Sequence, residues 1–472
     1  MALVLGVDSS TQSTKALLVD ASDGTILGRG QAAHPAGTEV DPRAWLAAYD
    51  DASRGLAHQA EAVAVGGQQH GLLALDEDHQ PVRDALLWND TRSAQAAIEL
   101  IEEWGGPEAC AEAVGSVLVA SFTVTKLRWL RDHEPDRAAR VRSVLLPHDY
   151  LSAHLSEPMT APFTDRGDAS GTGYFSTRAD TWRPELAAAA LGHEVDLPRI
   201  VGPGEIAGHT PTGQVLGAGT GDNMAAALGL DLRPGDIVVS IGTSGVASAV
   251  SDQPVIDPSG LVTGFADATG GFLPLVVTVN AAKILDLQAR LLGVTLGQLS
   301  DLALEAPVGA GGVTVLPYYG GERTPNRPYA TGTWAGLTDA TTPADLARAA
   351  FEALLCSLAD AIDALRAATP APSGPEAGRL VLIGGAARSP AVQALAPAIF
   401  GQPVVLPAPE EYVALGAARQ AAWALAGTAR PPEWPMPGSR LLEADPTPDV
   451  REQYAQLRDR TAVWSSSGRL DP

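Results

Sequence analysis

One pattern of residues occurs twice in the chain and restricts its fold more than any other feature. Residues 3–20 form an apolar run, a turn rich in Ser and Thr, and a second apolar run. Residues 236–252 repeat this order around a Gly/Ser/Thr turn. Short apolar runs bounded by turn residues are typical of β-strands. Because the copies lie far apart in the chain, we expect two related lobes and not a solenoid, whose repeats recur every ~20–50 residues.

Helical and strand-like patterns alternate between and after these copies, as expected of an α/β protein. The 472 residues are enough for two or three domains of roughly 150 residues. We divide the chain into an N-terminal lobe (1–233), a C-terminal lobe (234–437) and a peripheral, helical tail (438–472). The clearest expected elements are helices at 43–60, 91–104, 343–367 and 414–426, strands at 61–66, 143–147 and 379–383, and surface loops at 368–378 and 430–437.

Charge and cysteine content exclude several classes of protein. The formal net charge is −23, whereas nucleic-acid partners require clustered cations, so we expect no nucleic-acid binding. The two cysteines, Cys110 and Cys356, lie far apart, which indicates a reducing compartment without disulfides or a cysteine-based zinc site. No unbroken apolar stretch reaches the length of about 18 residues that a membrane-spanning helix needs. We therefore expect a soluble, cytoplasmic protein.

The turn after the first strand carries a carboxylate, several hydroxyls and an ammonium group. Its sequence is DSSTQSTK, from Asp8 to Lys15. Hydroxyls and backbone N–H groups of a tight turn can hold phosphate oxygens, and a carboxylate at a strand end can hold Mg²⁺. Many strand–turn–strand units carry Ser and Thr without such a role, so this turn alone decides little. The predicted phosphate contacts are Thr11, Gln12, Ser13, Thr14 and Lys15, and Asp8 is a predicted metal contact.

Two further Gly-rich turns strengthen a nucleotide-binding interpretation. The turn SIGTSG (240–245) lets a ligand approach the backbone and supplies hydroxyl donors. The segment VLIGGAARS (381–389) is a strand that runs into a Gly-Gly turn, where no Cβ would obstruct a flat adenosine. No Walker A pattern and no dinucleotide fingerprint occurs, so the three loops indicate an actin-type nucleotide cleft between the lobes. The predicted ATP contacts here are Gly242, Thr243, Ser244, Gly384, Gly385, Ala386 and Ser389.

Asp222 is our candidate catalytic base. It ends the Gly-rich loop AGTGD, and Gly219 and Gly221 leave its carboxylate open to a ligand. Transfer of a phosphoryl group to a hydroxyl needs a carboxylate that accepts the hydroxyl proton. An Asp at a helix start can also be a simple N-cap. We favour the catalytic role because the loop directly precedes the second phosphate turn, and we also assign Asp222 as a metal contact.

Two polar turns that follow strands have the composition of a site for a polyhydroxylated ligand. They are GGQQHG (66–71) and LLWNDTR (86–92). Amides, an imidazole and a carboxylate can pair with hydroxyls, and an indole can cover the C–H face of a sugar. Each residue has an ordinary alternative, such as a core histidine or a tryptophan in the core, but two such turns in close succession favour a sugar site. The predicted contacts are Gln69, His70, Trp88, Asn89 and Asp90, joined by Asn223.

Longer segments match the signatures of a known family. SFTVTKLRWLRDH (121–133) is similar to its first signature, and GTWAGLTDATTPADLARAAFE (332–352) to its second. YYGGERTP (318–325) is similar to its PYLxGERTP segment, and GVDSSTQSTK (6–15) to one form of its first phosphate loop. From the first strand to about residue 425, the sequence resembles the FGGY carbohydrate kinases, most closely the xylulokinases among them.

The resemblance implies two RNase-H-like lobes of the actin/hexokinase ATPase type, with a nucleotide and sugar cleft between them. It implies an ATP-dependent kinase that uses Mg²⁺ and phosphorylates a small-molecule sugar, D-xylulose, to D-xylulose 5-phosphate. By this resemblance, Asp222 is the catalytic base and Asp8 the metal-linked carboxylate. Gln69, His70 and Asn223 become contacts to the ketose. Relatives are often dimers, so we expect a homodimer.

One residue departs from the xylulokinase pattern. Xylulokinases often have Met before the turn histidine, and this chain has Gln69. An alternative substrate is therefore another ketose or a polyol, such as D-ribulose, L-xylulose or a tetritol. The Arg-Glu pair that glycerol kinases carry at this turn is absent, which argues against glycerol. A non-catalytic sugar-binding relative is a remote alternative, because such proteins typically lack the base or a phosphate loop, and this chain has both.

Overall fold

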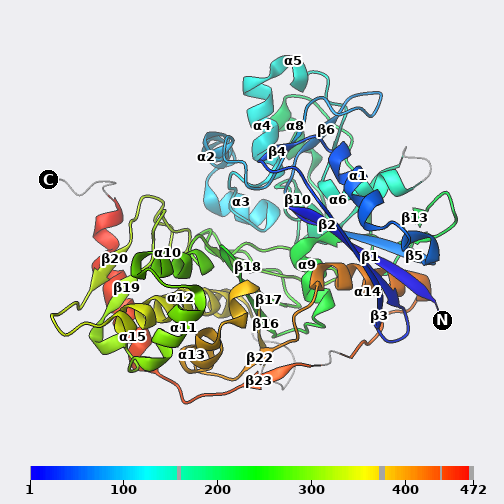
Figure 1. Cartoon of the computed structure of the whole chain (residues 1–472). Helices are drawn as coiled ribbons and strands as arrows, with labels where there is room; N and C mark the ends of the chain where they lie inside the picture. Colours follow the sequence, from blue (N-terminus) through cyan, green and yellow to red (C-terminus); the bar gives the residue numbers. More distant parts are fainter. Residues whose placement is uncertain (1, 157–160, 371–377, 436–437, 467–472) are drawn as a thin grey trace. The chain divides into compact units, whose positions relative to one another are not determined.

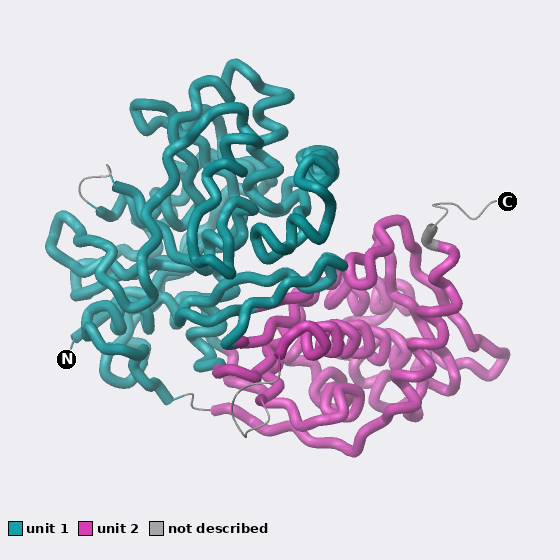
Figure 2. The backbone as a smooth tube through the Cα atoms, turned by 180° about the vertical axis from the view of Figure 1, so that it is seen from behind, with its two compact units in different colours: residues 1–232, 252–273, 410–435 teal, residues 233–251, 274–409, 436–472 magenta. Residues whose placement is uncertain are grey.

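The computed structural model describes residues 2–156, 161–370, 378–435 and 438–466 (Figure 1). The chain forms two compact units, shown in teal and magenta in Figure 2. Unit 1 consists of residues 1–232, 252–273 and 410–435, and unit 2 consists of residues 233–251, 274–409 and 436–472. None of the helices in the described ranges is long and apolar enough to cross a membrane.

A mixed β-sheet forms the centre of unit 1 (Figure 1). β1 (Leu3–Ser9) and β2 (Ser13–Asp20) are antiparallel, and the first predicted phosphate turn connects them. β5 (Ala62–Gly67) lies on the other side of β1 and runs parallel to it. All three strands are buried almost throughout, which explains their continuous apolar runs. The sheet is completed by β3 (Ile26–Ala33) beside β2, β14 (Val215–Leu216) and β15 (Thr220–Gly221) beside β5, and β13 (Gly208–His209) beside β14.

The sheet of unit 2 repeats this arrangement. β16 (Ile237–Ile241) and β17 (Gly245–Ala249) form an antiparallel hairpin around the second predicted phosphate turn. β21 (Leu380–Ile383) lies on the other side of β16 and is parallel to it, as β5 is to β1. The sheet is completed by β18 (Leu275–Thr278) beside β17, β22 (Val404–Leu406) beside β21, and β23 (Arg440–Leu442) beside β22.

Both units therefore place an antiparallel hairpin on one side of a strand and a parallel strand on the other. This repetition confirms the predicted fold class, an α/β protein with two related lobes of RNase-H-like type. The parallel pairs matter for function, because the carboxyl ends of parallel strands meet at one edge of a sheet. The predicted site turns follow the strands at this edge in each unit.

Helix α14 (Tyr412–Ala426) comes late in the chain but packs on the sheet of unit 1 and on α9 (Asp222–Gly229). The approach to the sheet is so close that it requires glycine. A Cβ on Gly6 of β1 would lie 1.9 Å from the carbonyl oxygen of Ala414. The segment 410–435 therefore belongs to unit 1. Helix α14 supports β1, which ends at the first predicted phosphate turn, and α9, which begins at the candidate base Asp222.

The other helices pack on the sheets or on one another. In unit 2, α12 (Pro343–Ala368) packs on β17 and β18, and it begins with a reciprocal capping box between Thr342 and Asp345. The remaining helices of unit 1 are α1 (Arg43–Ala52), α2 (Ala94–Glu103), α3 (Pro107–Val114), α4 (Thr123–His133), α5 (Pro135–Ala138), α6 (Pro147–Leu155), α7 (Arg166–Ala169) and α8 (Pro184–Leu191). Those of unit 2 are α10 (Ala282–Leu292), α11 (Leu296–Glu305), α13 (Pro390–Phe400) and α15 (Pro448–Arg460).

Most of the predicted elements are found within a few residues of their expected bounds, and the first helix is the main difference. The helix expected at 43–60 ends at Ala52, because Gly55 has a φ of +77° that a helix does not allow. Parts of the two predicted surface loops, 371–377 and 436–437, lie outside the described residues. The remaining strands pair as β4 (Glu39–Val40) with β7 (Ala85–Leu86), β6 (Leu73–Leu75) with β8 (Ser143–Leu145), β9 (Phe163–Asp165) with β12 (Arg199–Val201), β10 (Phe175–Ser176) with β11 (Thr181–Trp182), and β19 (Thr314–Leu316) with β20 (Thr333–Ala335).

Candidate functional site

The carboxyl ends of β1, β5 and β15 bring predicted site residues together at one edge of the sheet of unit 1. β5 lies between the other two strands. Its residue Gly66 is opposite Asp8 of β1 on one side and opposite Thr220 of β15 on the other. Asp222 follows β15 directly as the first residue of α9. The sheet register therefore places the two predicted carboxylates at the same edge, on either side of β5.

Asp8 is buried at the end of β1, among polar groups of the first turn. Its carboxylate accepts a hydrogen bond from Ser10 Oγ, and Lys15 Nζ lies 3.7 Å from Oδ2. Lys15 also forms a 2.6 Å ion pair with Glu411, which directly precedes α14. Burial raises the pKa of Asp8 to about 6, against the opposing hydrogen bond from Ser10 and the charge of Lys15. A desolvated carboxylate beside hydroxyls suits a hard cation or a phosphate-bound cation.

Asp222 belongs to a hydrogen-bonded cluster with two predicted ketose contacts. Its Oδ1 accepts hydrogen bonds from the backbone N of Asn223 at 2.7 Å and from Asn223 Nδ2 at 2.9 Å. The same Nδ2 donates to Gln69 Oε1 at 3.0 Å. Asp222 keeps some exposed surface, yet burial, and then the negative charge of Asp8, raise its pKa to about 7. A carboxylate with such a pKa can accept a proton near neutral pH, as a general base must.

His70 has a strained backbone and a fixed ring. Its φ of +66° lies in the left-handed region, which residues with a side chain rarely adopt. Its Nδ1 lies 2.8 Å from the carbonyl oxygen of Gly171 and donates a hydrogen bond to it. The ring packs beside Phe122 and Phe265, with centroid distances of 5.2 and 5.5 Å. Backbone strain of this kind persists where the surrounding structure enforces it, and it is frequent at functional sites.

The residues of the second polar turn differ in what they contact. Trp88 is 44% exposed, and its Nε1 donates to Thr11 Oγ1 at 2.8 Å, so the indole reaches the first phosphate turn and not the core. Asn89 is exposed. Asp90 is buried, and its carboxylate accepts hydrogen bonds from the backbone N and the Nε of Arg92. These contacts are typical of a structural carboxylate, so the geometry gives no support to the predicted sugar contact of Asp90.

Within the first predicted phosphate turn, the residues differ in solvent exposure. Gln12 is exposed and Thr11 is part-buried, whereas Ser13 and Thr14 are buried in β2. Thr14 Oγ1 is 2.8 Å from His34 Nε2 and hydrogen-bonded to it. Thr11 and Gln12 are therefore more accessible to a ligand than the hydroxyls of Ser13 and Thr14.

A buried polar cluster beneath this edge is absent from the sequence predictions. His148 Nδ1 lies 2.6 Å from Asp168 Oδ2 and 3.3 Å from Asp149 Oδ1. Asp165 accepts a 2.7 Å hydrogen bond from Thr220 Oγ1, which connects the cluster to the strand before α9. Burial would lower the pKa of His148, but the charge of Asp149 and the hydrogen bond to Asp168 outweigh it and raise this pKa to about 9. The neighbouring carboxylates therefore favour the protonated, positively charged form of the ring.

His148 contacts both segments that carry predicted site residues. A Cβ on Gly67 would lie 2.6 Å from the Cβ of His148, and a Cβ on Gly219 would lie 2.7 Å from its Cδ2. Gly67 ends the strand before the turn with Gln69, and Gly219 lies in the loop before Asp222. The ring thus fills the space beneath the two segments, and we expect it to hold them in register.

The predicted nucleotide turns of unit 2 also leave one edge of a sheet. Ser240 of β16 and Ile383 of β21 are register partners, so the two turns begin side by side. Gly384 has a φ of +96°, and a Cβ there would lie 2.6 Å from the carbonyl oxygen of Ile241. A Cβ on Gly385 would meet nothing within 4 Å, so this residue faces open space. An open glycine at a strand end suits the close approach of a flat ligand.

Side chains at these turns differ in accessibility. Thr243 and Ser244 are exposed, and Gly242 and Ala386 are part-buried. Ser389 Oγ donates to the hydroxyl of a neighbouring serine, Ser300, at 3.2 Å. The structure thus brings the predicted residues of this unit together at one sheet edge, with Ser389 already engaged by the protein.

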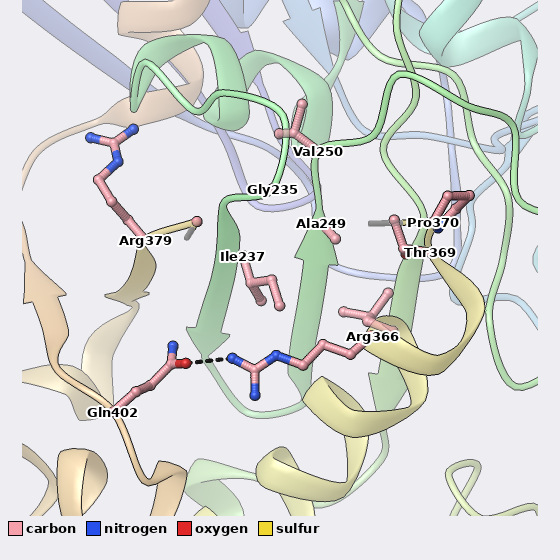
Figure 3. Close-up of a pocket in the computed structure, with 11 residues that line it drawn as sticks. Gly235, Ile237, Ala249, Val250, Arg366, Thr369, Pro370, Arg379 and Gln402 are labelled. Atoms are coloured by element: carbon pink, nitrogen blue, oxygen red, sulfur yellow. Dashed lines mark hydrogen bonds between the residues drawn. The ribbon is translucent and has the colours of Figure 1, made fainter. Parts of the chain in front are cut away.

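A separate cavity of about 280 Å³ lies at the opposite edge of this sheet (Figure 3). Ile237, which begins β16, and Ala249, which ends β17, form part of its wall. The guanidinium of Arg366 donates to Gln402 Oε1 at its side. None of the predicted site residues is among those that line this cavity, so we do not assign the reaction to it. The lining residues are Gly235, Ile237, Ala249, Val250, Leu365, Arg366, Thr369, Pro370, Gly378, Arg379 and Gln402.

Two groups of side chains in unit 1 have the composition of a metal site. Asp8 and Asp222 supply the hard oxygen donors that Mg²⁺ prefers, and a cation would relieve the repulsion between them. His148, Asp149 and Asp168 have possible ligand atoms within 4.8 Å of one another. Because Nδ1 of His148 already hydrogen-bonds Asp168, this cluster is a better fit to an internal ion pair than to a magnesium site.

Comparisons with known proteins identify the family of this chain. The N-terminal domain model of the FGGY family of carbohydrate kinases matches residues 3–229, and the C-terminal domain model matches residues 237–425. The chain is 46% identical to the xylulose kinase of Streptomyces coelicolor, over 99% of this chain and 97% of that protein. It is 33% identical to the xylulose kinase of Haemophilus influenzae, over 89% of this chain and 90% of that protein.

A solved structure extends the likeness to the fold. The xylulose kinase of Bifidobacterium adolescentis matches with a TM-score of 0.90 and 42% identity, covering 97% of this chain and 99% of that one. Family models, full-length relatives and this structure all indicate the same family. The chain therefore belongs to the FGGY family of carbohydrate kinases, and it is a sugar kinase that uses ATP as its co-substrate.

Proposed function

We propose that this kinase transfers the γ-phosphoryl group of ATP to D-xylulose and releases D-xylulose 5-phosphate and ADP. The observation that carries this proposal is the 46% identity, over nearly the full length, to proteins named xylulose kinase. The geometry of unit 1 supports it, because Asp222, Asn223 and Gln69 form one hydrogen-bonded cluster beside the first phosphate turn.

Asp222 is the general base in this proposal. The C5 hydroxyl oxygen of the ketose forms a bond to the γ-phosphorus, the bond from this phosphorus to the β,γ-bridging oxygen breaks, and the hydroxyl proton passes to Asp222. Asn223 holds Oδ1 through its backbone and its side chain, so we assign Oδ2 as the oxygen that receives the proton. With a pKa of about 7, the carboxylate is about half ionised at neutral pH and increasingly ionised above it.

The first turn and the two carboxylates bind the phosphate end of ATP. Asp8 and Asp222 would hold Mg²⁺, which when bound neutralises charge on the phosphate oxygens. Lys15 lies beside Asp8 and adds a positive charge to the same edge. The proposed phosphate contacts of this turn are Thr11, Gln12, Ser13, Thr14 and Lys15. We expect the more accessible Thr11 and Gln12 to contribute more than the buried Ser13 and Thr14.

In unit 2 we assign the hairpin turn to the phosphates and the Gly-Gly turn to adenosine. The exposed hydroxyls of Thr243 and Ser244 support the first assignment. The open space at Gly385 supports the second. The complete set of proposed nucleotide contacts is Gly242, Thr243, Ser244, Gly384, Gly385, Ala386 and Ser389.

Gln69 is the proposed ketose contact for which the geometry gives the strongest support. Its Oε1 is bonded to Asn223, and its Nε2 is buried without a hydrogen-bond partner among the described residues. A buried donor without a partner is costly, and a sugar hydroxyl would satisfy it. The other proposed contacts are His70, Trp88, Asn89, Asp90 and Asn223, of which Asp90 already accepts a hydrogen bond from Arg92.

Three further predictions stay proposals. They are the division of the chain into residues 1–233, 234–437 and 438–472, a homodimer, and a location in the cytoplasm. Light scattering during size-exclusion chromatography tests the homodimer, and a mass of one chain would contradict it.

The test of the substrate is ADP release with Mg²⁺ and ATP across D-xylulose, D-ribulose, L-ribulose, L-xylulose, glycerol and gluconate. We expect the highest kcat/KM for D-xylulose, and loss of the activity in Asp222→Asn. A clear preference for another sugar, still lost in that variant, would refute D-xylulose and retain the kinase mechanism. Activity that survives in the variant would refute Asp222 as the base.

A further inference from the structure

Arg323, between β19 and β20 in unit 2, is a cation whose guanidinium has no partner among the described residues. Its side chain is part-buried. Among the residues that the structure describes, no carboxylate pairs with its guanidinium, although the chain is rich in acidic residues and has a net charge of −23. Burial lowers the pKa of Arg323, and no charged or hydrogen-bonding group offsets this effect. Burial of a charge without a partner opposes folding.

More deeply buried arginines in the described ranges behave differently. Each of them forms an ion pair with an Asp or Glu side chain, as the general cost of burying a charge requires. Within the described residues, the guanidinium of Arg323 is therefore left available for an external anion. The paired arginines are Arg83, Arg128, Arg166, Arg348 and Arg419.

The neighbours of Arg323 are fixed against the end of β18. Glu322 is buried, and its Oε1 accepts hydrogen bonds from the backbone N of Val279 at 2.5 Å and of Arg323 at 2.8 Å. Its Oε2 accepts a 2.8 Å hydrogen bond from Asn280 Nδ2. On the other side, Thr324 Oγ1 donates to a backbone carbonyl of β18 at 2.9 Å. The backbone on both sides of the unpaired arginine is therefore held in place.

The same end of β18 holds the proposed phosphate turn of unit 2. The backbone N of Ala282 donates to the carbonyl oxygen of Gly242 at 2.9 Å. Ser244 Oγ donates to the carbonyl oxygen of Val279 at 3.5 Å. Val279 thus contacts the turn through its carbonyl and Glu322 through its N–H. Two hydrogen bonds separate the residue before Arg323 from the hydroxyl of the turn.

We propose that Arg323 binds the phosphate oxygens of the nucleotide at the turn Gly242–Ser244. This inference rests on the proposed function, which assigns nucleotide phosphates to that turn. A guanidinium carries N–H donors in a planar array that matches phosphate oxygens, and it stays charged. The turn itself offers backbone and hydroxyl groups but no cation, so Arg323 supplies the positive charge that phosphoryl transfer requires near the phosphates.

This role predicts opposite effects on stability and on binding. Arg323→Met keeps a long side chain but removes the unpaired charge, so the Tm of the nucleotide-free protein stays unchanged or rises. The affinity for Mg-ADP falls by roughly 10- to 100-fold, the range for one charge-assisted contact. Adenosine has no phosphates, and it binds equally to both proteins. Arg323→Lys keeps the charge but loses the planar set of N–H donors, so its affinity for Mg-ADP should lie between those of the wild-type protein and Arg323→Met.

The experiment measures Kd by calorimetry and Tm by thermal unfolding, on the full chain without sugar. The ligands are Mg-ADP, adenosine and D-xylulose 5-phosphate, which separates nucleotide phosphates from the phosphate of the product. Arg366→Met is the matched control, because Arg366 is an exposed arginine of the same unit at the opposite edge of the sheet. We expect Mg-ADP binding to weaken only in the Arg323 variants.

Several results would overturn the proposal. A lower Tm for Arg323→Met with unchanged Mg-ADP affinity would show a structural arginine. An equal loss of adenosine and Mg-ADP binding would show that the change acts through the fold of the turn. Loss of D-xylulose 5-phosphate binding alone would assign the arginine to the sugar phosphate. If the wild-type protein binds Mg-ADP but does not phosphorylate D-xylulose, the proposed substrate fails while the result on Arg323 stands.

Discussion

The two units have the same arrangement of strands, but the functional edges of their sheets carry different groups. At the edge of unit 1 lie ionisable side chains, above all Asp8, Asp222 and His148 beneath them. At the edge of unit 2 the turns carry glycine and exposed hydroxyls, as at Gly385 and Thr243. On our assignment, one supersecondary scaffold serves different tasks: proton transfer and phosphate binding in unit 1, and nucleotide recognition in unit 2.

The two edges also differ in the charged groups that lie near them. In unit 1, burial raises the pKa values of Asp8 and Asp222, and Lys15 is the nearby cation. In unit 2, the one cation that we place near the turn, Arg323, has no internal anion in the described part of the chain. Substitutions in unit 1 should therefore change kcat most, and substitutions in unit 2 should change the affinity for ATP most.

Asp222→Asn gives the largest expected effect, a fall in kcat of about 10²- to 10⁴-fold, the usual contribution of a general base. Mg-ADP affinity should fall much less than kcat, because Asp8 and the turns of unit 2 still hold the nucleotide. The measurement is steady-state kinetics with D-xylulose together with calorimetry. The control is Asp84→Asn, because Asp84 is an exposed carboxylate of the same unit. A similar fall in the control, or none in Asp222→Asn, would remove the distinction between the two edges.

His148→Gln should lower both stability and activity. It leaves Asp149 and Asp168 buried without their cation, and breaking a buried ion pair costs about 3–5 kcal/mol. Because the ring lies beneath Gly67 and Gly219, we also expect a lower kcat and a higher sugar KM, by about tenfold, a shift that even a small misplacement of catalytic groups can produce.

The control for this variant is His58→Gln, at an exposed histidine, and Mg-ADP affinity is the internal reference. A lower Tm with unchanged kinetic constants would show that the cluster stabilises unit 1 without positioning its site.

Two neighbouring glycines in unit 2 test the adenosine assignment. Gly385→Val adds a side chain into open space, so we expect unchanged stability and a KM for ATP raised by roughly tenfold, about 1.4 kcal/mol. Gly384→Ala instead forces a Cβ against Ile241 at a φ of +96°, so we expect a lower Tm. Thermal unfolding and ATP titration separate the two outcomes, and unchanged ATP kinetics in Gly385→Val would contradict the assignment.

Gln69→Met gives the smallest expected effect. The change removes the buried Nε2 donor and restores the residue common in xylulokinases, so a sugar contact worth about 0.5–1.5 kcal/mol is lost. We expect the KM for the preferred sugar to rise by about 3- to 10-fold, with little change in the KM for ATP. Kinetics with D-xylulose and D-ribulose provide the measurement. Unchanged constants for both sugars would place Gln69 outside the ketose site.

The sequence was sufficient for much of the fold, because its strongest signals are local. The repeated strand–turn–strand pattern predicted both sheets, and the Gly-rich turns marked the edge at which each site lies. The helix predicted at 43–60 is longer than the observed helix, which ends at Ala52. A glycine is tolerated in a helical pattern, but Gly55 has a left-handed backbone in the structure. The packing of α14 onto unit 1 depends on contacts between residues far apart in the chain, which a local pattern cannot reveal.

The candidate site could be predicted only where its functional residues stand close together in the sequence. Asp222 and Asn223 stand together in a Gly-rich loop, and their contact with Gln69 follows the prediction. His148 lacked such a signal, apart from its place directly after the strand expected at 143–147, because its partners come from α6, β9 and α7. Arg323 lies in the segment YYGGERTP, but the lack of a partner for it among the described residues can be recognised only from the structure.

The most direct test is the pH dependence of kcat/KM for D-xylulose. If Asp222 with its pKa of about 7 is the base, the reaction needs the ionised carboxylate. We then predict that kcat/KM falls by about tenfold per pH unit below about pH 7, and that this limb disappears in the residual activity of Asp222→Asn. A profile that stays flat from pH 8 to well below 7, or an identical acid limb in the variant, would contradict proton transfer to Asp222.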